Sequence, residues 1–210
     1  MIRLDIYSDP VCPWCFIGKA RLARALESRP AHPFEIHWQP FQLNPDMPAE
    51  GMERDEYMAL KFGDDQGVLE AYRPVVEAAE EIGLTLDLPA ITRMPNTADA
   101  HRLIHWAGLE GRQNAMVDAL FCGFFQQGRD IGQADTLVDI AASAGLDRQM
   151  IARLLASDAD RALILESDRA ARARGISGVP FFILDRSHAL SGAQPVALWQ
   201  DVIDQLSRPE

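Results

Sequence analysis

Apolar and polar residues alternate at the start of the chain and again near position 34. The first alternation predicts a strand over Ile2–Tyr7, and the second predicts a strand from Phe34 to about Phe41. Between them, apolar residues recur at helical spacing and predict a helix over Gly18–Ser28. This order is compatible with a right-handed parallel crossover. Central parallel strands are usually apolar on both faces, so the alternation indicates that one face meets something more polar than a core.

Helical periodicity dominates the middle of the chain. Glycines stand at the ends of the periodic segments, where helices commonly terminate. Asp135 and Asp147 occupy positions where N-caps are expected. The predicted helices are Met52–Phe62, Val68–Ile82, Ala98–Leu109, Gln113–Gln126, Asp135–Ala144, Arg148–Ala156 and Asp160–Arg174.

Strand patterns return near the C-terminus. Phe181–Leu184 and His188–Ser191 read as short strands, and Val196–Leu206 reads as a final helix. A helical block therefore interrupts a strand–helix–strand start and a strand–strand–helix finish. We predict an α/β fold in which residues 1–46 and 158–210 form one domain. Residues 47–157 form an all-helical domain inserted between its second and third strands.

Composition narrows the function classes. The 210 residues suffice for one large domain or a small domain with an insertion, and 48% are hydrophobic. A net charge of −11 argues against nucleic acid and anionic membranes as partners. Three cysteines exclude a framework of structural disulfides. Neither a signal peptide nor a membrane-spanning run is recognisable, which predicts a cytoplasmic protein.

The main chemical signal is the pair Cys12 and Cys15, which lies between the first strand and the first helix. Unpaired N–H groups and partial positive charge at a helix N-terminus favour thiolate over thiol. Cys12 should lie nearer the helix end and be more exposed, so it is the candidate nucleophile. Cys15, one turn further on, is the candidate resolving thiol. Pro13 suits the first turn because it lacks an N–H group there.

Other interpretations of the cysteine pair are less favoured. A zinc site needs about four ligands, and Cys122 is the one further cysteine. A permanent structural disulfide would suit an oxidising compartment, which nothing else in the sequence indicates. A chance pair of inert thiols is the third alternative. It is less favoured because the pair stands between a strand and a helix, which is the context that a redox site requires.

Two further sets of residues have mainly structural interpretations. His101 and His105 stand one helical turn apart, a spacing that can bind a metal, but no third ligand is evident. Cys122 lies in an apolar run and is expected to be a buried core residue. No buried proton acceptor for the cysteine pair stands out among the nearby residues Asp9, Glu35 and Gln39.

Four stretches resemble the DsbA-like thioredoxin-fold oxidoreductases, specifically the FrnE-type subgroup. They are Ser8–Gly18, Pro40–Pro45, Asn96–Leu103 and Gly175–Phe182, which together extend over most of the chain. The resemblance implies a thioredoxin fold for the strand-containing domain. In related glutathione-dependent isomerases and kappa-class glutathione transferases, a serine stands where this chain has Cys12. The dithiol here therefore favours redox chemistry.

The resemblance also implies roles for individual residues. Val179–Pro180 should be a cis peptide next to the active site, with Val179 offering backbone hydrogen bonds to a substrate. Pro13 and Trp14 should border the same substrate-binding site. Asn96 should face the cleft and help to bind substrate, although helix capping by Asn96 or Thr97 explains the motif equally well.

Three hypotheses about function result. The leading one is a thiol–disulfide oxidoreductase that acts on protein disulfides or small thiol compounds, with Cys12 and Cys15 as catalytic residues. It needs no metal or organic cofactor, but it needs glutathione or another thiol as co-substrate. The second is a glutathione-dependent isomerase or transferase for an aromatic or polyketide-like small molecule. The third is a redox-regulated, chaperone-like binder. Related proteins are often dimers, so a homodimer remains open.

Overall fold

A four-stranded sheet lies at the centre of the protein. The structure is a computed structural model that describes residues 1–207. The strand order is β2-β1-β5-β6. Strand β1 (Ile2–Ser8) runs parallel to β2 (Phe34–Pro40) and antiparallel to β5 (Phe181–Leu184), and β5 pairs with β6 (His188–Ser191). The predicted parallel strand pair and the two C-terminal strands are confirmed.

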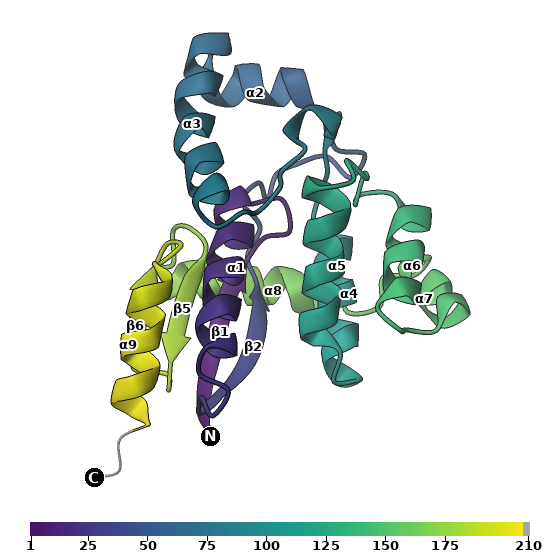
Figure 1. Cartoon of the computed structure of the whole chain (residues 1–210). Helices are drawn as coiled ribbons and strands as arrows, with labels where there is room; N and C mark the ends of the chain where they lie inside the picture. The colour runs from purple at the N-terminus through teal and green to yellow at the C-terminus, as the bar shows by residue number, and fades with distance from the viewer. Residues whose placement is uncertain (208–210) are drawn as a thin grey trace.

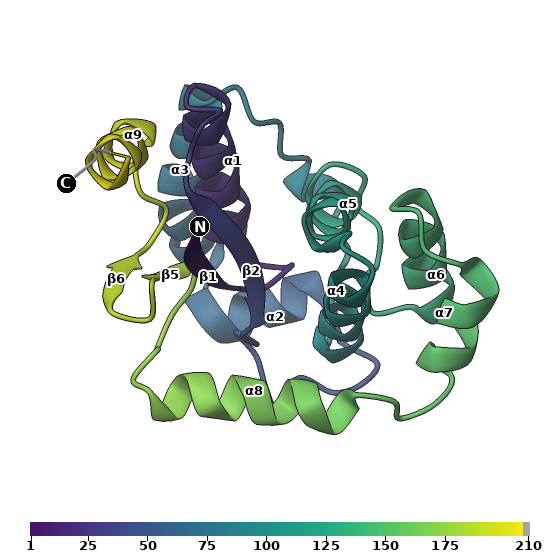
Figure 2. The same ribbon diagram turned by 90° about the horizontal axis from the view of Figure 1, so that it is seen from below.

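Helices cover both faces of the sheet. Figures 1 and 2 show α1 (Pro13–Glu27) and α9 (Val196–Leu206) on one face and α8 (Arg161–Ala173) on the other. On the first face, Trp199 of α9 is fully buried and contacts Phe182 edge-on at 4.8 Å between ring centroids. On the second face, Tyr7 of β1 packs with Ala171 of α8 and with Phe41. The predicted final helix is confirmed over Val196–Leu206.

The polar positions of β1 explain its alternating sequence. Leu4 and Ile6 point into the main apolar core, whereas Asp5 lies on the opposite face. The Asp5 carboxylate accepts hydrogen bonds from the Arg3 guanidinium at 2.6 and 2.8 Å and from the Gln39 amide at 2.7 Å. The inference that one face meets a more polar environment is therefore confirmed.

Helix α1 begins at Pro13, earlier than the predicted start at Gly18. Cys15, Phe16 and Ile17 are all buried, so this first turn shows no one-sided apolar pattern from which a helix could be predicted. Cys12 is the N-cap, and its side chain accepts from the Cys15 backbone N–H. The two cysteines therefore belong to the first turn of the helix and its cap.

The segment between β2 and α8 is mainly helical, as predicted. Met52 and Glu53 were predicted to begin a helix, but they form strand β3 and pair with β4. The N-cap of α6 is Gln133, so the assignment of Asp135 as a cap is wrong, whereas Asp147 caps α7 through Met150 N–H at 2.7 Å. The elements are β3 (Met52–Glu53), α2 (Arg54–Phe62), α3 (Asp65–Glu81), the 3₁₀ helix η1 (Leu88–Ala90), β4 (Arg93–Met94), α4 (Ala98–Leu109), α5 (Gln113–Phe125), α6 (Ala134–Ser143) and α7 (Arg148–Leu155).

One apolar core joins the sheet region to the helical segment. Phe16 of α1 stacks on Phe121 and Phe125 of α5, with ring centroids 5.0 and 5.8 Å apart. Burial of aromatic rings of this size contributes about 1.5–3 kcal/mol each to stability. This contact fixes α5 against the helix that carries the cysteine pair. The division into domains at residues 46 and 157 remains a prediction.

Candidate active site

The cysteine pair lies at the N-terminus of α1, where the chain leaves β1. The Cys12 sulfur accepts the Cys15 backbone N–H at 3.4 Å, and both cysteines are free thiols. The same N–H group also donates to the Cys12 backbone carbonyl at 3.1 Å, so carbonyl and sulfur share this donor of the first helical turn. A backbone donor directed at a sulfur is a feature of reactive cysteines at helix N-termini. The local geometry thus supports Cys12 as the nucleophile.

The residues that precede β5 form the opposite wall of the site. The Cys12 thiol donates to the Val179 carbonyl oxygen at 3.6 Å, and the Val179–Pro180 peptide bond is cis. Gly18 of α1 allows this close approach, because a Cβ atom there would lie 3.1 Å from Cγ of Pro180. The chain thus brings together Cys12, Val179 and Pro180, although the cysteine and the proline are far apart in the sequence.

Cys12 is only slightly more exposed than Cys15, at 3% against 1%. Burial raises the pKa of the Cys15 thiol well above that of an ordinary cysteine. A hydrogen bond with Cys12 and the charge of Cys12 raise this pKa further, while the Asp9 backbone and the Ser8 side chain lower it. Cys15 is therefore a protonated thiol near neutral pH. This is the state expected of a resolving cysteine before the mixed disulfide forms.

We predict selective alkylation of the reduced protein. Iodoacetamide near neutral pH should modify Cys12, which lines an open cleft, and leave Cys15 unmodified because its raised pKa keeps the thiol protonated. Peptide mapping by mass spectrometry measures both sites, and the same reaction in guanidinium chloride, where both react, is the control. Equal labelling of the two cysteines in the folded protein would contradict this assignment.

An open cleft of about 270 Å³ adjoins Cys12. It is predominantly apolar, and most of its lining comes from the α1 terminus, the segment after β2, and helices α2 and α3. Of the predicted site residues, its lining contains Cys12, Pro13, Trp14 and Val179, but not Cys15, Pro180 or Asn96. The other lining residues are Val11, Leu43, Asn44, Tyr57, Lys61, Phe62, Ala71, Tyr72, Val75 and Met94.

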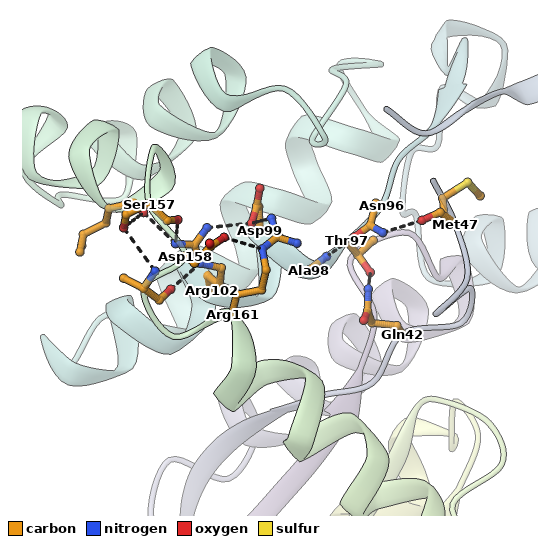
Figure 3. Close-up of polar contacts among 12 residues, drawn as sticks. Gln42, Met47, Asn96, Thr97, Ala98, Asp99, Arg102, Ser157, Asp158 and Arg161 are labelled. Carbon is orange, nitrogen blue, oxygen red and sulfur yellow. Dashed lines mark hydrogen bonds and ion pairs between the residues drawn. The ribbon is translucent and has the colours of Figure 1, made fainter. Parts of the chain in front are cut away.

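Asn96 uses its side-chain amide within the protein. The amide nitrogen donates to the Met47 carbonyl at 2.7 Å, and the amide oxygen accepts from Ala98 N–H at 3.0 Å (Figure 3). The second contact satisfies an N–H group of the first turn of α4, while the Thr97 side chain makes no capping bond. The capping interpretation is thus confirmed for Asn96, and its role in substrate binding remains a prediction.

The same motif contains Arg102, which has no solvent-exposed surface. Its guanidinium donates to the carbonyl oxygens of Leu154, Ser157 and Ala159, each at 2.7 Å, and to the Asp99 carboxylate at 2.9 Å (Figure 3). The planar fork of arginine satisfies all these acceptors together. The motif therefore ties α4 to the connection between α7 and α8.

We predict that Arg102→Met lowers the free energy of unfolding by about 2–4 kcal/mol, because it removes charged donors from several acceptors at once. Arg102→Lys should recover only part of the loss, since an ammonium cannot reproduce the fork. Urea unfolding measures both, and Arg153→Met on the exposed side of α7 is the control. A loss below about 0.5 kcal/mol, typical of surface changes, would contradict this role.

A buried acid–histidine pair lies beside the active-site loop. Asp9 and His101 are 0% and 3% exposed, and the His101 Nε2 atom lies 3.7 Å from Oδ1 of Asp9. Neither of these two atoms has a hydrogen-bond partner among the residues that the structure describes. The other Asp9 oxygen accepts from Leu43 N–H at 2.7 Å, and the Asp9 carbonyl accepts from Cys12 N–H at 2.9 Å.

Sequence reasoning missed this pair, because His101 was assigned to a helix face and Asp9 did not stand out. Its two members come from the end of β1 and from α4, and no local pattern links them. Asp9 holds the loop before Cys12 against the segment after β2. His105, one helical turn from His101, is half-buried. The described residues contain no cluster of three or more groups able to hold a metal.

We predict that Asp9→Ala lowers the free energy of unfolding by about 1–3 kcal/mol, because Leu43 N–H loses its acceptor. Asp9→Asn keeps a side-chain oxygen at this position and should lose less. Thermal or urea unfolding distinguishes them. Equal stability of the alanine variant and the wild type would show that the loop is held in another way.

Cys122 is half-buried on α5 and does not line the cleft. Burial raises its pKa, and the nearby Asp118 carboxylate acts in the same direction. Both effects disfavour the thiolate. Cys122 packs against the main apolar core, but it is only partly buried rather than buried as expected.

Comparison with known proteins gives one family. A model of the DSBA-like thioredoxin domain matches residues 3–204. The crystal structure of a probable DsbA oxidoreductase from Streptomyces coelicolor is 32% identical, with a TM-score of 0.84 over 100% of this chain and 92% of that one.

Two more distant structures show the fold alone. The cytosolic disulfide reductase DsbM from Pseudomonas aeruginosa, solved with GSH, is 18% identical, with a TM-score of 0.71 over 99% of this chain and 100% of that one. A 2-hydroxychromene-2-carboxylate isomerase is also 18% identical, with a TM-score of 0.74 over 98% and 96% of the two chains. No described helix is both long and apolar enough to cross a membrane.

Proposed function

The chain belongs to the DSBA-like thioredoxin-domain family, and we propose that it is a thiol–disulfide oxidoreductase that works through Cys12 and Cys15. The observation that carries the proposal is the contact between the Cys12 sulfur and the Cys15 backbone N–H, with a second, buried thiol one turn further along the helix. A nucleophilic sulfur and a resolving sulfur are the two groups that disulfide exchange needs.

The first step of the proposed reaction is attack by Cys12. Its thiolate forms a bond to one sulfur of a substrate disulfide, the substrate S–S bond breaks, and one substrate thiolate leaves. The product is a mixed disulfide between Cys12 and the substrate. The backbone N–H of Cys15 stabilises the attacking anion, and the Val179 carbonyl beside Cys12 borders the position that the substrate must enter.

The second step uses Cys15. Its thiol loses its proton, attacks the Cys12 sulfur and releases the second substrate thiolate, so that two electrons pass from the protein to the substrate. The raised pKa of Cys15 delays this deprotonation until the mixed disulfide has formed and the negative charge on Cys12 has gone. Glutathione or another thiol then reduces the Cys12–Cys15 disulfide, and the reverse sequence oxidises a dithiol. We place this reaction in the cytoplasm.

A trapping experiment tests the proposal. Cys15→Ser mixed with glutathione disulfide alone should accumulate a mixed disulfide with glutathione at Cys12, because the second protein thiol that would release it is gone, and disulfide turnover should fall by at least about a hundredfold. Intact-protein mass spectrometry detects the adduct of one glutathione. Cys122→Ser is the matched control and should behave like the wild type. Full turnover by Cys15→Ser would contradict the dithiol mechanism.

A glutathione-dependent isomerase or transferase is the alternative. The predominantly apolar cleft beside Cys12 favours it, because small aromatic substrates need such a surface. In that case Cys12 would hold or activate glutathione and Cys15 would be dispensable. This second function would be supported if the wild type showed no disulfide turnover and Cys15→Ser kept a glutathione-dependent activity.

A further inference from the structure

Lys61 is an exposed cation in the last turn of α2. It is one of two lysines, and the other, Lys19, forms an ion pair with Asp118. Lys61 has no carboxylate within ion-pair distance among the residues that the structure describes. Its ammonium donates to the Tyr57 hydroxyl at 2.6 Å, which uses one of its three N–H donors. Several arginines, Arg153 among them, likewise have no ion pair among the described residues, so what distinguishes Lys61 is its place in the lining of the cleft that contains Cys12.

Lys61 lies on the same face of α2 as two other polar residues. Arg54, Tyr57 and Lys61 are three and four residues apart and so share a face of the helix. The Tyr57 hydroxyl, which accepts from Lys61, donates to the Asn44 side chain at 3.0 Å. Arg54 also has no acidic partner among the described residues, and its guanidinium carbon lies 5.8 Å from the ring centroid of Tyr72.

This face of α2 borders the cleft that contains Cys12. Lys61, Tyr57, Asn44 and Tyr72 line the same cavity as Cys12. The lining includes no aspartate or glutamate, so Lys61 is its one formally charged residue. A ligand can bury apolar surface against the predominantly apolar wall. Lys61 adds a positive charge to the same cleft as the reactive sulfur of Cys12.

We propose that this cleft selects small disulfides that carry a carboxylate, with the substrate sulfur at Cys12 and the carboxylate at Lys61. Arg54, at the other end of α2, lies outside the cavity lining but beside Tyr72, which is part of it. The cavity of about 270 Å³ is at the small end for ligand sites, which suits one arm of a small disulfide. The inference rests on the proposed oxidoreductase function and names its substrate class. The exchange steps are unchanged, and the carboxylate takes no part in bond making.

A purely structural role for Lys61 makes a different prediction. The residue lies in the last turn of α2, where a cation interacts favourably with the helix dipole. That role would affect the stability of α2 but would not distinguish substrates by charge. The test must therefore compare disulfides of different charge rather than measure activity alone.

The experiment uses three aliphatic disulfides of similar size. They are 3,3′-dithiodipropionate, which is anionic, bis(2-hydroxyethyl) disulfide, which is neutral, and cystamine, which is cationic. Each is mixed with the reduced protein at low ionic strength, because screening by salt weakens the interaction. Acid quenching, alkylation and mass spectrometry give the rate at which the Cys12–Cys15 disulfide forms.

Variants of the two cations supply the comparison. Lys61→Met should slow oxidation by 3,3′-dithiodipropionate about fivefold and leave the neutral disulfide within about twofold, as expected for loss of one partly exposed ion pair. Lys61→Arg should restore the preference. Arg54→Met should act in the same direction as Lys61→Met. Arg153→Met removes one positive charge from α7, outside the cleft. It should leave the ratio of the rates with the anionic and the neutral disulfide unchanged.

The outcomes separate this inference from the function on which it rests. If Lys61→Met changes the anionic and neutral rates equally, or changes neither, then Lys61 does not select carboxylates and the inference is overturned. The same holds if Arg153→Met lowers the ratio as much as Lys61→Met. If no probe produces a Cys12–Cys15 disulfide in the wild type, the proposed oxidoreductase function fails as well.

Discussion

The site depends on one short contact, the Cys15 backbone N–H that points at the Cys12 sulfur. It exists because α1 begins at Pro13, so that Cys12 is the cap and Cys15 lies in the first turn. The N–H groups of a first helical turn lack acceptors four residues earlier, and this one is shared between the Cys12 carbonyl and the Cys12 sulfur. The reactive group is thus placed by a general property of helix ends.

The fold holds this helix end from three sides. Strand β1 leads the chain to Asp9, whose carbonyl accepts the Cys12 N–H. Phe16 anchors α1 to α5 through stacked rings. The segment before β5 brings Val179 to the Cys12 thiol. The helical segment between β2 and α8 then supplies one wall of the cleft, so it contributes to the site without contributing a cysteine.

Much of the fold was predictable because its signals are local. Alternation marked β1 and β2, two short strand segments on either side of a turn marked β5 and β6, and α4 and α9 began and ended as predicted. The start of α1 was missed because Cys15, Phe16 and Ile17 are three consecutive buried residues, which hides the helical period. Strand β3 was missed because two residues are too few to show a pattern, and its partner β4 lies some forty positions away by register.

Some residues of the candidate site could be predicted from the sequence and others could not. Cys12 and Cys15 follow from their spacing, and Val179 and Pro180 follow from resemblance to a family. The Asp9–His101 pair and the cleft face of α2 could not be found in this way, because each depends on contacts between distant segments. Asn96 shows the limit of motif reasoning, since its amide caps a helix and ties down Met47 while its predicted substrate role stays open.

The measurement that tests the central claim most directly is equilibration of the protein in a series of glutathione redox buffers, followed by alkylation of free thiols. The account predicts that Cys12 and Cys15 change together between a dithiol and one intramolecular disulfide, with a single two-electron transition that Cys122→Ser leaves unchanged. Absence of that disulfide at every ratio, with only a glutathione adduct on Cys12, would contradict the oxidoreductase assignment and favour the glutathione-dependent alternative.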